Sequence, residues 1–517
     1  MFVCFPTQGL SPEEGGGWDD VSFHGSAQIP TPNLDTLAAD GIILNNYYTQ
    51  PICTPSRAAL LSGMYPIRTG MQHFVNQGAE PSGLPLDVKL MPQYLKELGY
   101  ESHLVGKWHL GYFKKKYTPT YRGFDSFYGL FNGEGDYLNH TYTQDNQTGL
   151  DFWTGTEPLW NETGNYATTL FTQRAVHLIR TRNKNKVYAL SRFGHYFAVL
   201  QLMHFIIQIA RTGDDRGRIC VEERDAMDES VGAVVEELYE ARMLDNTIVV
   251  FLSDNGGQPW GAHATRSFNW PLRGTKQTLW EGGCRVSAFL WSPLVARRGR
   301  VSQQMMHVTD WLPTLYSAAG GKPGHLVTSW TARDMWRHLS LGKSSPRPEI
   351  LYNVDPIQGT AALRYRNYKL VQGVFLNGTF DDRFRTTGNP RPQPDLDDLM
   401  GTSRVARALK GLYRRNALRF PKNWRQRATL RCDDAGRGRP SNFASGKPPY
   451  LFDLEKDPCE LRNLASTLPN VVAFLQKRLE RYAASSVPPG NQPIDPRGYP
   501  DNNNGIWAPW VVTACSG

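Results

Sequence analysis

The stretch PICTPSRAALLSGMYPIRTG, residues 51–70, places a cysteine and an arginine at Cys53 and Arg57, at the start of a helix-like apolar run. In this context Cys53 is a buried thiol, half of a disulfide, a cysteine nucleophile, or the precursor of a modified residue. A cysteine protease would need a histidine and an orienting Asn or Asp, and nothing near Cys53 resembles those families. The sequence also has no GxSxG, no Walker A motif and no GxGxxG after a strand.

Other polar side chains follow predicted strands and suit an anionic substrate. FLSDNGG ends a strand with Asp254 and Asn255, whose oxygens are ligands for a hard cation such as calcium or magnesium. VGKWHLG brings Lys107 and His109 to the end of another strand, and PLRGTKQTLWEGG supplies Lys276 between glycines. Each residue alone also fits a turn, a surface lysine or a structural histidine. Together, several cations near a hard-metal site predict a tetrahedral anionic substrate, a phosphate or sulfate ester.

Helix and strand patterns alternate along the chain and position these residues. Apolar residues at helical spacing, followed by a short apolar run, occur at 31–50, at 90–111 and most clearly at 227–257. This alternation predicts an α/β domain with a mostly parallel sheet, in which ligand sites gather at the carboxyl ends of strands.

The pattern of predicted helices and strands changes near residue 345. Short strand-like runs separated by turns, and then an amphipathic helix at 470–485, predict a smaller α+β domain. At 517 residues the chain is long enough for one large and one small domain. We therefore expect a catalytic domain over 1–344 and a C-terminal domain over 345–517, with a basic insertion at about 400–445.

The net charge of +9 is concentrated in one place, residues 404–440. Such a run is a solvated basic insertion, or it binds a polyanion. No nucleic-acid module pattern surrounds it, so we expect no nucleic-acid partner.

Cysteines and glycosylation motifs give information on the cellular compartment of the protein. The seven cysteines include no CxxC pair, which argues against a structural zinc site. Sequons occur at Asn139, Asn146, Asn161 and Asn377, and three of them lie within one polar stretch, which favours an exposed loop in the secretory pathway. The first residues do not form a convincing signal peptide. The most apolar run, 195–210, is short and interrupted by polar residues, so we expect no transmembrane segment.

The motifs together resemble those of the sulfatase family. Cys53-Thr54-Pro55-Ser56-Arg57 followed by AALLSG is similar to the sulfatase signature C-x-P-S-R with a downstream L-[S/T]-G. VGKWHLG, SDNGGQ and NWPLRGTKQTLWEGG are similar to further sulfatase blocks in the same order, and the similarity runs from Trp18 to GIWAPW. Within the family, the closest resemblance is to the arylsulfatase B group with arylsulfatases I and J.

The resemblance implies a fold and an activity. The fold would be an alkaline-phosphatase-like, mostly parallel sheet flanked by helices, with a C-terminal four-stranded antiparallel sheet and a helix. The activity would be hydrolysis of sulfuric esters. The substrate would be an aryl sulfate or a sulfated sugar, such as an N-acetylgalactosamine 4-sulfate end in a glycosaminoglycan. The protein would act in the lysosome or outside the cell.

The resemblance also implies roles for the motif residues. The formylglycine-generating enzyme would oxidise Cys53 to formylglycine, whose hydrated form attacks sulfur and then releases free sulfate. Arg57 would hold the diol. Lys107 and Lys276 would bind the sulfate group, and His109 would assist the elimination step.

A calcium site and a proton donor complete the implied active site. Asp254 and Asn255 would bind Ca²⁺, with the oxygen derived from Cys53 as a further ligand. His204, in VLQLMHFIIQI, aligns with the histidine that contacts the substrate and protonates the leaving group.

The start of the chain departs from the family pattern. Sulfatases begin with a hydrophobic strand that ends in Asp-Asp-Leu-Gly-Trp, and its acidic pair supplies two calcium ligands. Counting back from Trp18, the pair falls at Glu14 and Gly15, and we expect no first strand before them. Our hypothesis is a truncated or incorrect N-terminus, which sequencing of the 5′ end of the transcript would test.

The same departure keeps other functions open. One alternative is a catalytically inactive, secreted sulfatase-like protein that holds polyanions through residues 404–440. A related phosphodiesterase is a third option, although that branch has Thr or Ser where this chain has Cys53.

Overall fold

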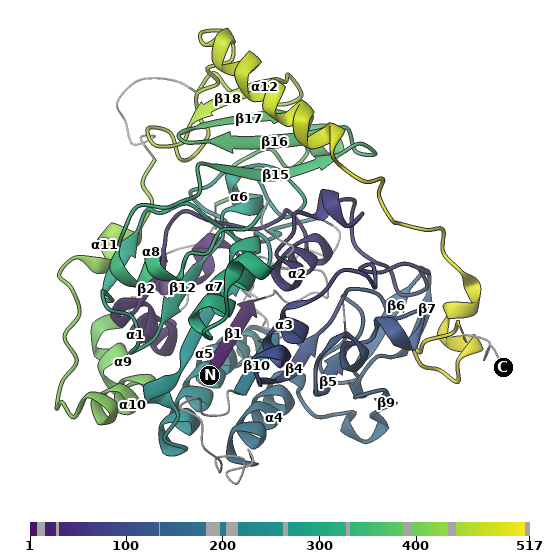
Figure 1. The fold of residues 1–517 in the computed structure, drawn as a ribbon, viewed down its shortest axis with the longest axis vertical. Helices are drawn as coiled ribbons and strands as arrows, with labels where there is room; N and C mark the ends of the chain where they lie inside the picture. Colours follow the sequence, from purple (N-terminus) through teal and green to yellow (C-terminus); the bar gives the residue numbers. More distant parts are fainter. Residues whose placement is uncertain are drawn as a thin grey trace.

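A large mixed sheet with helices on both faces forms the body of the molecule, and a small sheet lies beyond one end of it (Figure 1). The computed structural model describes residues 1–7, 16–26, 30–133, 135–181, 197–202, 216–261, 267–326, 331–385, 395–432 and 441–511.

The large sheet has ten strands. In spatial order they are β13 (Arg300–Ser302), β2 (Ile42–Leu44), β12 (Ala288–Trp291), β11 (Ile248–Ser253), β1 (Phe2–Thr7), β10 (Phe197–Leu202), β4 (Glu101–Lys107), β5 (Ser126–Leu130), β8 (Trp153–Thr154) and β9 (Glu157–Pro158). The central strands from β11 to β5 are parallel. Every residue of β11 is buried, as expected for a strand covered on both faces. The predicted α/β fold is confirmed.

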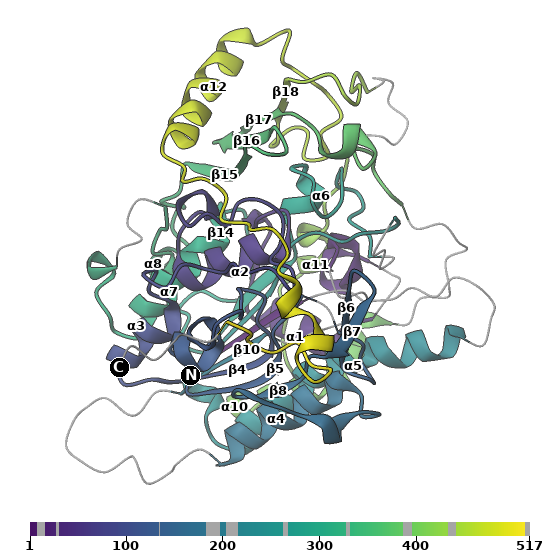
Figure 2. The same cartoon turned by 90° about the vertical axis from the view of Figure 1, so that its right-hand side faces the viewer.

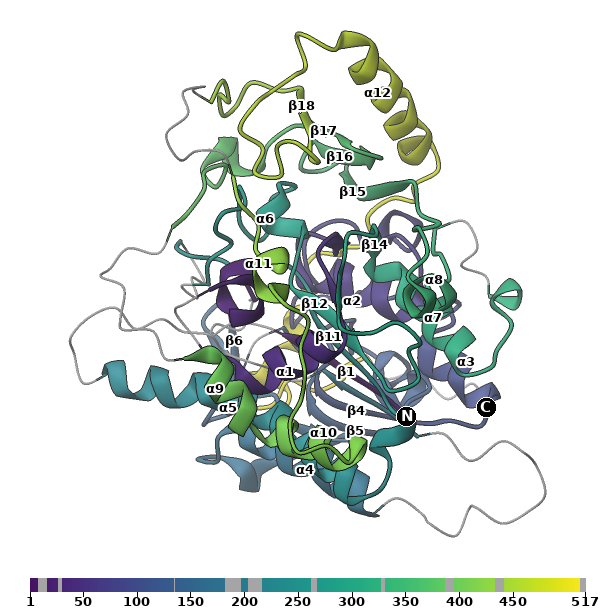
Figure 3. The same ribbon diagram turned by 90° about the vertical axis from the view of Figure 1, so that its left-hand side faces the viewer.

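Two groups of helices cover the two faces of this sheet (Figures 2 and 3). One group consists of α1 (Pro32–Asp40), α4 (Ala167–Thr181), α5 (Arg216–Glu240), α9 (Leu396–Thr402) and α10 (Arg404–Tyr413). The other consists of α2 (Cys53–Ser62), α3 (Met91–Glu97), α7 (Trp311–Ala318) and α8 (Trp336–Leu341). The first of these, α1, begins with Pro32 in its first turn and ends at Gly41, as its sequence predicts.

The expectation that no strand precedes Glu13 is wrong. Strand β1 lies at the centre of the sheet, where Phe2 to Thr7 pair with Ile248 to Ser253 of β11. A proline in a central strand normally argues against a strand, because it removes a ladder hydrogen bond. Here β10 pairs only with Phe2 and Val3, so Pro6 lies past the part of β1 that β10 contacts.

The small sheet is antiparallel and carries one long helix on its outer face. Its strands are β15 (Glu349–Asp355), β16 (Thr360–Tyr365), β17 (Tyr368–Gln372) and β18 (Tyr450–Asp453), and the helix is α12 (Pro469–Ala484). Leu475 and Leu479 of α12 are buried against it. Its inner face packs on the short helix α6 (Glu281–Cys284) and on Tyr48, in the short parallel pair β3 (Tyr47–Tyr48) and β14 (Met306–His307).

The C-terminal segment returns from α12 to the large domain. Figure 1 shows it descending to the hairpin of β6 (Thr141–Gln144) and β7 (Gln147–Leu150). Trp507 is fully buried there and its indole nitrogen donates to the Tyr142 carbonyl at 2.9 Å. This segment therefore holds the hairpin against the rest of the molecule.

The basic stretch does not stay with the small sheet. Figure 3 shows α10 beside α5; α9 lies against α1 and α10, and the short helix α11 (Trp424–Ala428) follows in the chain. A disulfide between Cys432 and Cys459, with 6.0 Å between their Cα atoms, connects the end of this stretch to the segment after β18.

Within the part of the chain that the structure describes, no helix has the length and apolar character needed to cross a membrane.

Candidate active site

Cys53 opens helix α2 and its side chain is completely buried. The chain enters the helix through a locked turn, because the Ser56 hydroxyl bonds both the amide and the carbonyl of Gln50 at 3.1 Å. The neighbouring Thr54 hydroxyl donates to the His109 carbonyl at 3.0 Å and accepts from the Asn76 amide at 3.2 Å. Cys53 is thus held at the junction of three segments.

Arg57, one helical turn after Cys53, ties α2 to the ends of two strands. Its Nη1 donates to the carbonyl of Lys107, the last residue of β4, at 2.9 Å. Its Nε and Nη2 each lie 3.3 Å from Oδ2 of Asp254, which follows β11. The parallel sheet brings both strand ends to the same edge, so one arginine reaches both.

Lys107 is a fully buried cation. Its Nζ has no hydrogen-bond partner among the described residues. Burial lowers the pKa of Lys107 to about 8, Arg57 and Lys276 act in the same direction, and Cys53 and Asp254 oppose the shift. A buried ammonium without a partner is costly, which is a reason to expect an anionic ligand beside it.

His109 is held in one tautomer. Its Nε2 lies 3.0 Å from the Asn76 carbonyl, which can only accept, so the ring proton is on Nε2. Burial, and then the nearby Lys107 and Arg57, hold the pKa of His109 well below its usual value. The imidazole is therefore neutral, and Nδ1, which has no partner among the described residues, carries a lone pair that can accept a proton.

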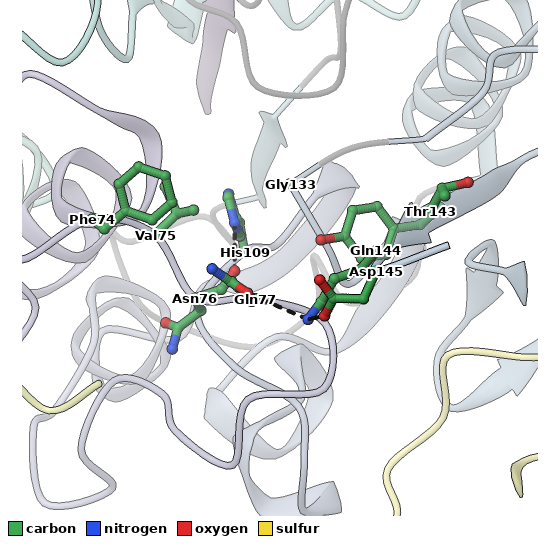
Figure 4. A pocket seen from close by; sticks show the side chains of 10 residues that line it. Phe74, Val75, Asn76, Gln77, His109, Gly133, Thr143, Gln144 and Asp145 are labelled. Atoms are coloured by element: carbon green, nitrogen blue, oxygen red, sulfur yellow. Dashed lines mark hydrogen bonds between the residues drawn. The ribbon is translucent and has the colours of Figure 1, made fainter. Parts of the chain in front are cut away.

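Gly133 fixes the position of that imidazole (Figure 4). A Cβ atom at Gly133 would lie 2.2 Å from Cε1 of His109, far inside van der Waals contact. Only a residue without a side chain permits the ring to occupy this place.

For the sulfuric ester hydrolysis that the sequence resemblance implies, we expect Gly133→Ala to lower kcat/KM by about 10²-fold, since displacements of about 1 Å at a reacting group have effects of this size. The matched control is Gly135→Ala on the same loop, where the nearest atom is 3.6 Å from the new Cβ. Kinetics with 4-nitrocatechol sulfate and melting temperatures of both variants check the prediction. Equal losses in the two variants would mean that the loop, and not His109, is affected.

Asp254 and Asn255 present hard oxygen donors at the end of β11. Asn255 is completely buried, its Nδ2 donates to the Gly256 carbonyl at 2.9 Å, and its Oδ1 has no partner among the described residues. An orphaned amide oxygen beside a carboxylate fits a calcium ligand pair. No group of three acidic, histidine or cysteine side chains suited to a metal occurs within the described ranges, from which Glu13 and Glu14 are absent.

Lys276 comes to the same place from the loop between β11 and α6. Its amide donates to the Gly257 carbonyl at 3.1 Å, and its side chain is 2% exposed. The loop approaches β11 closely, since a Cβ at Gly256 would lie 1.7 Å from the Gly282 carbonyl oxygen. Lys276, Arg57 and Asp254 all influence the pKa of Lys107, which places the four charged groups around one point.

The structure thus brings together seven of the predicted site residues: Cys53, Arg57, Lys107, His109, Asp254, Asn255 and Lys276. His204 lies outside the described residues. The sequon asparagines Asn139, Asn146, Asn161 and Asn377 are all exposed. Sequence reasoning missed Asn76 and Gly133. Asn76 acts on His109 through its backbone carbonyl, which leaves no trace in residue type.

The basic stretch is partly neutralised. Arg404 pairs with Glu229 and Glu236 of α5, and Arg425 pairs with Asp35 and Asp397. These arginines hold α9 to α11 against the large domain, so part of the charge of residues 404–440 serves packing.

Among the residues that the structure describes, the site has three buried cations, Arg57, Lys107 and Lys276, and one carboxylate, that of Asp254. Such a site favours an anion, and the mostly parallel sheet places it at the carboxyl ends of β4 and β11. The fold and the site define a hydrolase of anionic esters.

Comparison with known proteins identifies the family. The sulfatase family model matches residues 13–193 and 225–321. Arylsulfatase J of Mus musculus is 36% identical over 512 residues, which cover 96% of this chain and 78% of that protein. N-acetylgalactosamine-6-sulfatase of Canis lupus familiaris is 32% identical over 371 residues, 68% of this chain and 69% of that protein. The chain belongs to the sulfatase family and is a sulfuric ester hydrolase.

Solved structures agree in fold. The crystal structure of Ps i-CgsB in complex with k-i-k-neocarrahexaose superposes with a TM-score of 0.67 at 21% identity, covering 94% of this chain and 93% of that one.

Proposed function

We propose that this sulfatase uses formylglycine derived from Cys53, together with one calcium ion, to hydrolyse the sulfate ester of a sulfated sugar such as N-acetylgalactosamine 4-sulfate. The observation that carries the proposal is that two groups lie near Cys53: the buried ammonium of Lys107, which has no hydrogen-bond partner among the described residues, and the neutral imidazole of His109. The first suits binding of a sulfate group and the second suits proton transfer.

The side chains of the site have different roles in this reaction. Lys107 and Lys276 hold the sulfate oxygens and stabilise the charge that develops on them. Arg57 fixes the first turn of α2 relative to Lys107 and Asp254, so that the group at position 53 faces the sulfate. His109 accepts a proton at Nδ1. Hydrated formylglycine would supply one hydroxyl as the nucleophile that takes the sulfo group from the ester, and a second hydroxyl whose deprotonation expels sulfate and restores the aldehyde.

The calcium ion would be held by Asp254 and Asn255, and it would supply fixed positive charge at the nucleophile. The described residues on either side of segment 8–15 reach the same strand end: Thr7 pairs with Ser253, and the Gly16 amide donates to the Ser253 hydroxyl at 2.9 Å. Glu13 and Glu14 lie outside the described residues.

The proposal includes a compartment and a partner. Conversion of Cys53 requires the formylglycine-generating enzyme, and the four exposed sequons suit a chain that passes through the secretory pathway to the lysosome or the exterior. We propose His204 as the proton donor to the leaving alcohol. The choice of sugar is supported by the relative named N-acetylgalactosamine-6-sulfatase, although that name specifies sulfate at position 6 and not at position 4.

Mass spectrometry of the Cys53 peptide tests this function. Protein secreted from animal cells is expected to carry an aldehyde at position 53 that reacts with a hydrazide probe, and to hydrolyse 4-nitrocatechol sulfate. An unmodified thiol without hydrolysis would instead support the inactive polyanion-binding alternative.

A further inference from the structure

A cavity of about 290 Å³ opens beside His109 (Figure 4). Its walls are Phe74 to Gln77 on one side and the hairpin residues Tyr142 to Asp145 on the other, with His109 and Gly133 between them. The volume is close to the lower limit of small-molecule sites, roughly 300 Å³. It suits one sugar ring better than an extended oligosaccharide.

The cavity adjoins the nucleophile position. Val75, which lines it, packs against Cys53 and Ile52 in a small apolar cluster, and Phe74 packs against the same cluster. His109 forms a wall of the cavity and is also close to Lys107. A ring in the cavity could therefore carry a sulfate group at the buried cations.

A hydrogen-bond chain sets the polarity of one wall. The Tyr499 hydroxyl donates to Asp145 Oδ2 at 2.9 Å, and Gln144 Nε2 donates to the same oxygen at 3.0 Å and to Gln77 Oε1 at 3.3 Å. Gln144 Oε1 in turn accepts from the Ala79 amide at 3.2 Å. Because the carbonyl oxygen of Gln77 is occupied, its Nε2 is presented as a donor, which suits a sugar hydroxyl or an acetamido oxygen.

The described residues that line the cavity carry negative charge but no positive charge. None of the ten described residues that line it is a lysine or an arginine, His109 is neutral, and Asp145 is its one carboxylate. A uronic acid or a second sulfate group would meet no cation there and would face the carboxylate of Asp145. A neutral ring meets no such repulsion.

The backbone around the cavity adopts a rare conformation. Phe74 and His109 have positive φ, at 45° and 59°, whereas the positive φ of Asp145, 50°, belongs to the two-residue turn that it forms with Asn146 between β6 and β7. Such conformations persist where the surrounding structure holds a functional geometry.

From these observations we infer that the cavity is the subsite for the sulfate-bearing sugar ring, and that Gln77 and Asp145 select an uncharged hexose or hexosamine and reject a uronate. The inference rests on the proposed function, because it takes the sulfate site to lie at Lys107 and Lys276.

Two variants of the formylglycine-bearing enzyme test it. The substrates are 4-nitrocatechol sulfate, N-acetylgalactosamine 4-sulfate and glucuronate 2-sulfate. Gln77→Ala is expected to lower kcat/KM for the sulfated hexosamine about tenfold more than for the aryl sulfate, the effect of one lost hydrogen bond. Asp145→Lys is expected to shift the kcat/KM ratio of uronate to hexosamine at least about tenfold toward the uronate. The charge-matched control, Glu157→Lys on exposed strand β9, should leave that ratio in place.

The outcomes separate the subsite from the chemistry. Equal losses on aryl and sugar sulfates in Gln77→Ala, or an unchanged ratio in Asp145→Lys, would overturn the inference. If the wild type turns over none of the substrates, the proposed catalytic function fails. Calorimetric binding of the two sugar sulfates to Cys53→Ala protein, with and without Asp145→Lys, then decides the subsite independently of turnover. A preference for the hexosamine that Asp145→Lys reverses supports it, and equal affinities contradict it.

Discussion

Cys53→Ala is expected to reduce hydrolysis of 4-nitrocatechol sulfate by at least about 10³-fold, because under the proposed function it removes the source of the nucleophile and leaves only binding and electrostatic stabilisation. The substitution should leave the fold intact. Cys53 is completely buried at the start of α2, and alanine removes one sulfur atom without adding volume. The cost in folding free energy is about 1–2 kcal/mol, from lost burial and a small cavity.

The chain offers a matched control in Cys284. This thiol is also completely buried, burial raises its pKa, and its Sγ lies 3.6 Å from the Thr278 carbonyl oxygen. Cys284→Ala should cost a similar folding free energy. It should keep turnover within about twofold, because Cys284 has no role in the proposed chemistry. Turnover by Cys53→Ala above about one hundredth of wild type would point to another nucleophile.

The sequence predicts the parts of this molecule that depend on local patterns. Helical periodicity followed by an apolar run predicts α1, α5 and β11, because burial of one face is visible in residue spacing. Polar residues after β4 and β11 are predicted to meet, because parallel strands end at one edge of a sheet. The sulfatase motifs add the identity of the residues that gather there.

Features that depend on long-range packing were not predictable. Strand β1 contains Pro6, which argues against a central strand, and its place in the sheet is set by β11, far away in sequence. The orientation of His109 depends on the Asn76 carbonyl and on the absence of a side chain at Gly133. The pairing of Cys432 with Cys459 has no local signature either. Each of these contacts joins segments whose spacing in the chain carries no information about their distance in space.

Lys107→Met is expected to lower activity and raise stability at once. Methionine matches the length and apolar stem of lysine but removes the charge that would bind sulfate. Loss of one such electrostatic contact lowers kcat by about 10²–10³-fold. In the absence of substrate the same ammonium is buried without a hydrogen-bond partner among the described residues, so its removal should stabilise the folded state.

The stabilisation has a defined pH dependence. Burial lowers the pKa of Lys107 from 10.5 to about 8, so the folded state holds this proton less tightly than the unfolded state does. At pH 7 the lysine is charged in both states and the folded state bears a penalty of about 3 kcal/mol. As the pH rises through about 8 the folded lysine loses its proton and the penalty declines, and it disappears above the unfolded pKa. Denaturant titrations of wild type and Lys107→Met at pH 7 and pH 9.5 should therefore show a gain that shrinks at the higher pH.

Lys369 is as deeply buried as Lys107 but, unlike Lys107, is paired with carboxylates. It is also completely buried, but its Nζ lies 3.0 Å from Glu281 and 2.7 Å from Glu460, and these carboxylates raise its pKa. Lys369→Met leaves the buried Glu460 without this cation and Glu281 with only the more distant Arg285, at 3.6 Å, and should cost about 3–5 kcal/mol of folding free energy. The same chemical change should thus stabilise the protein at position 107 and destabilise it at position 369. A loss of stability at both positions would show that the charge of Lys107 is compensated within the protein. It would contradict the inference that Lys107 needs a sulfate group as its partner.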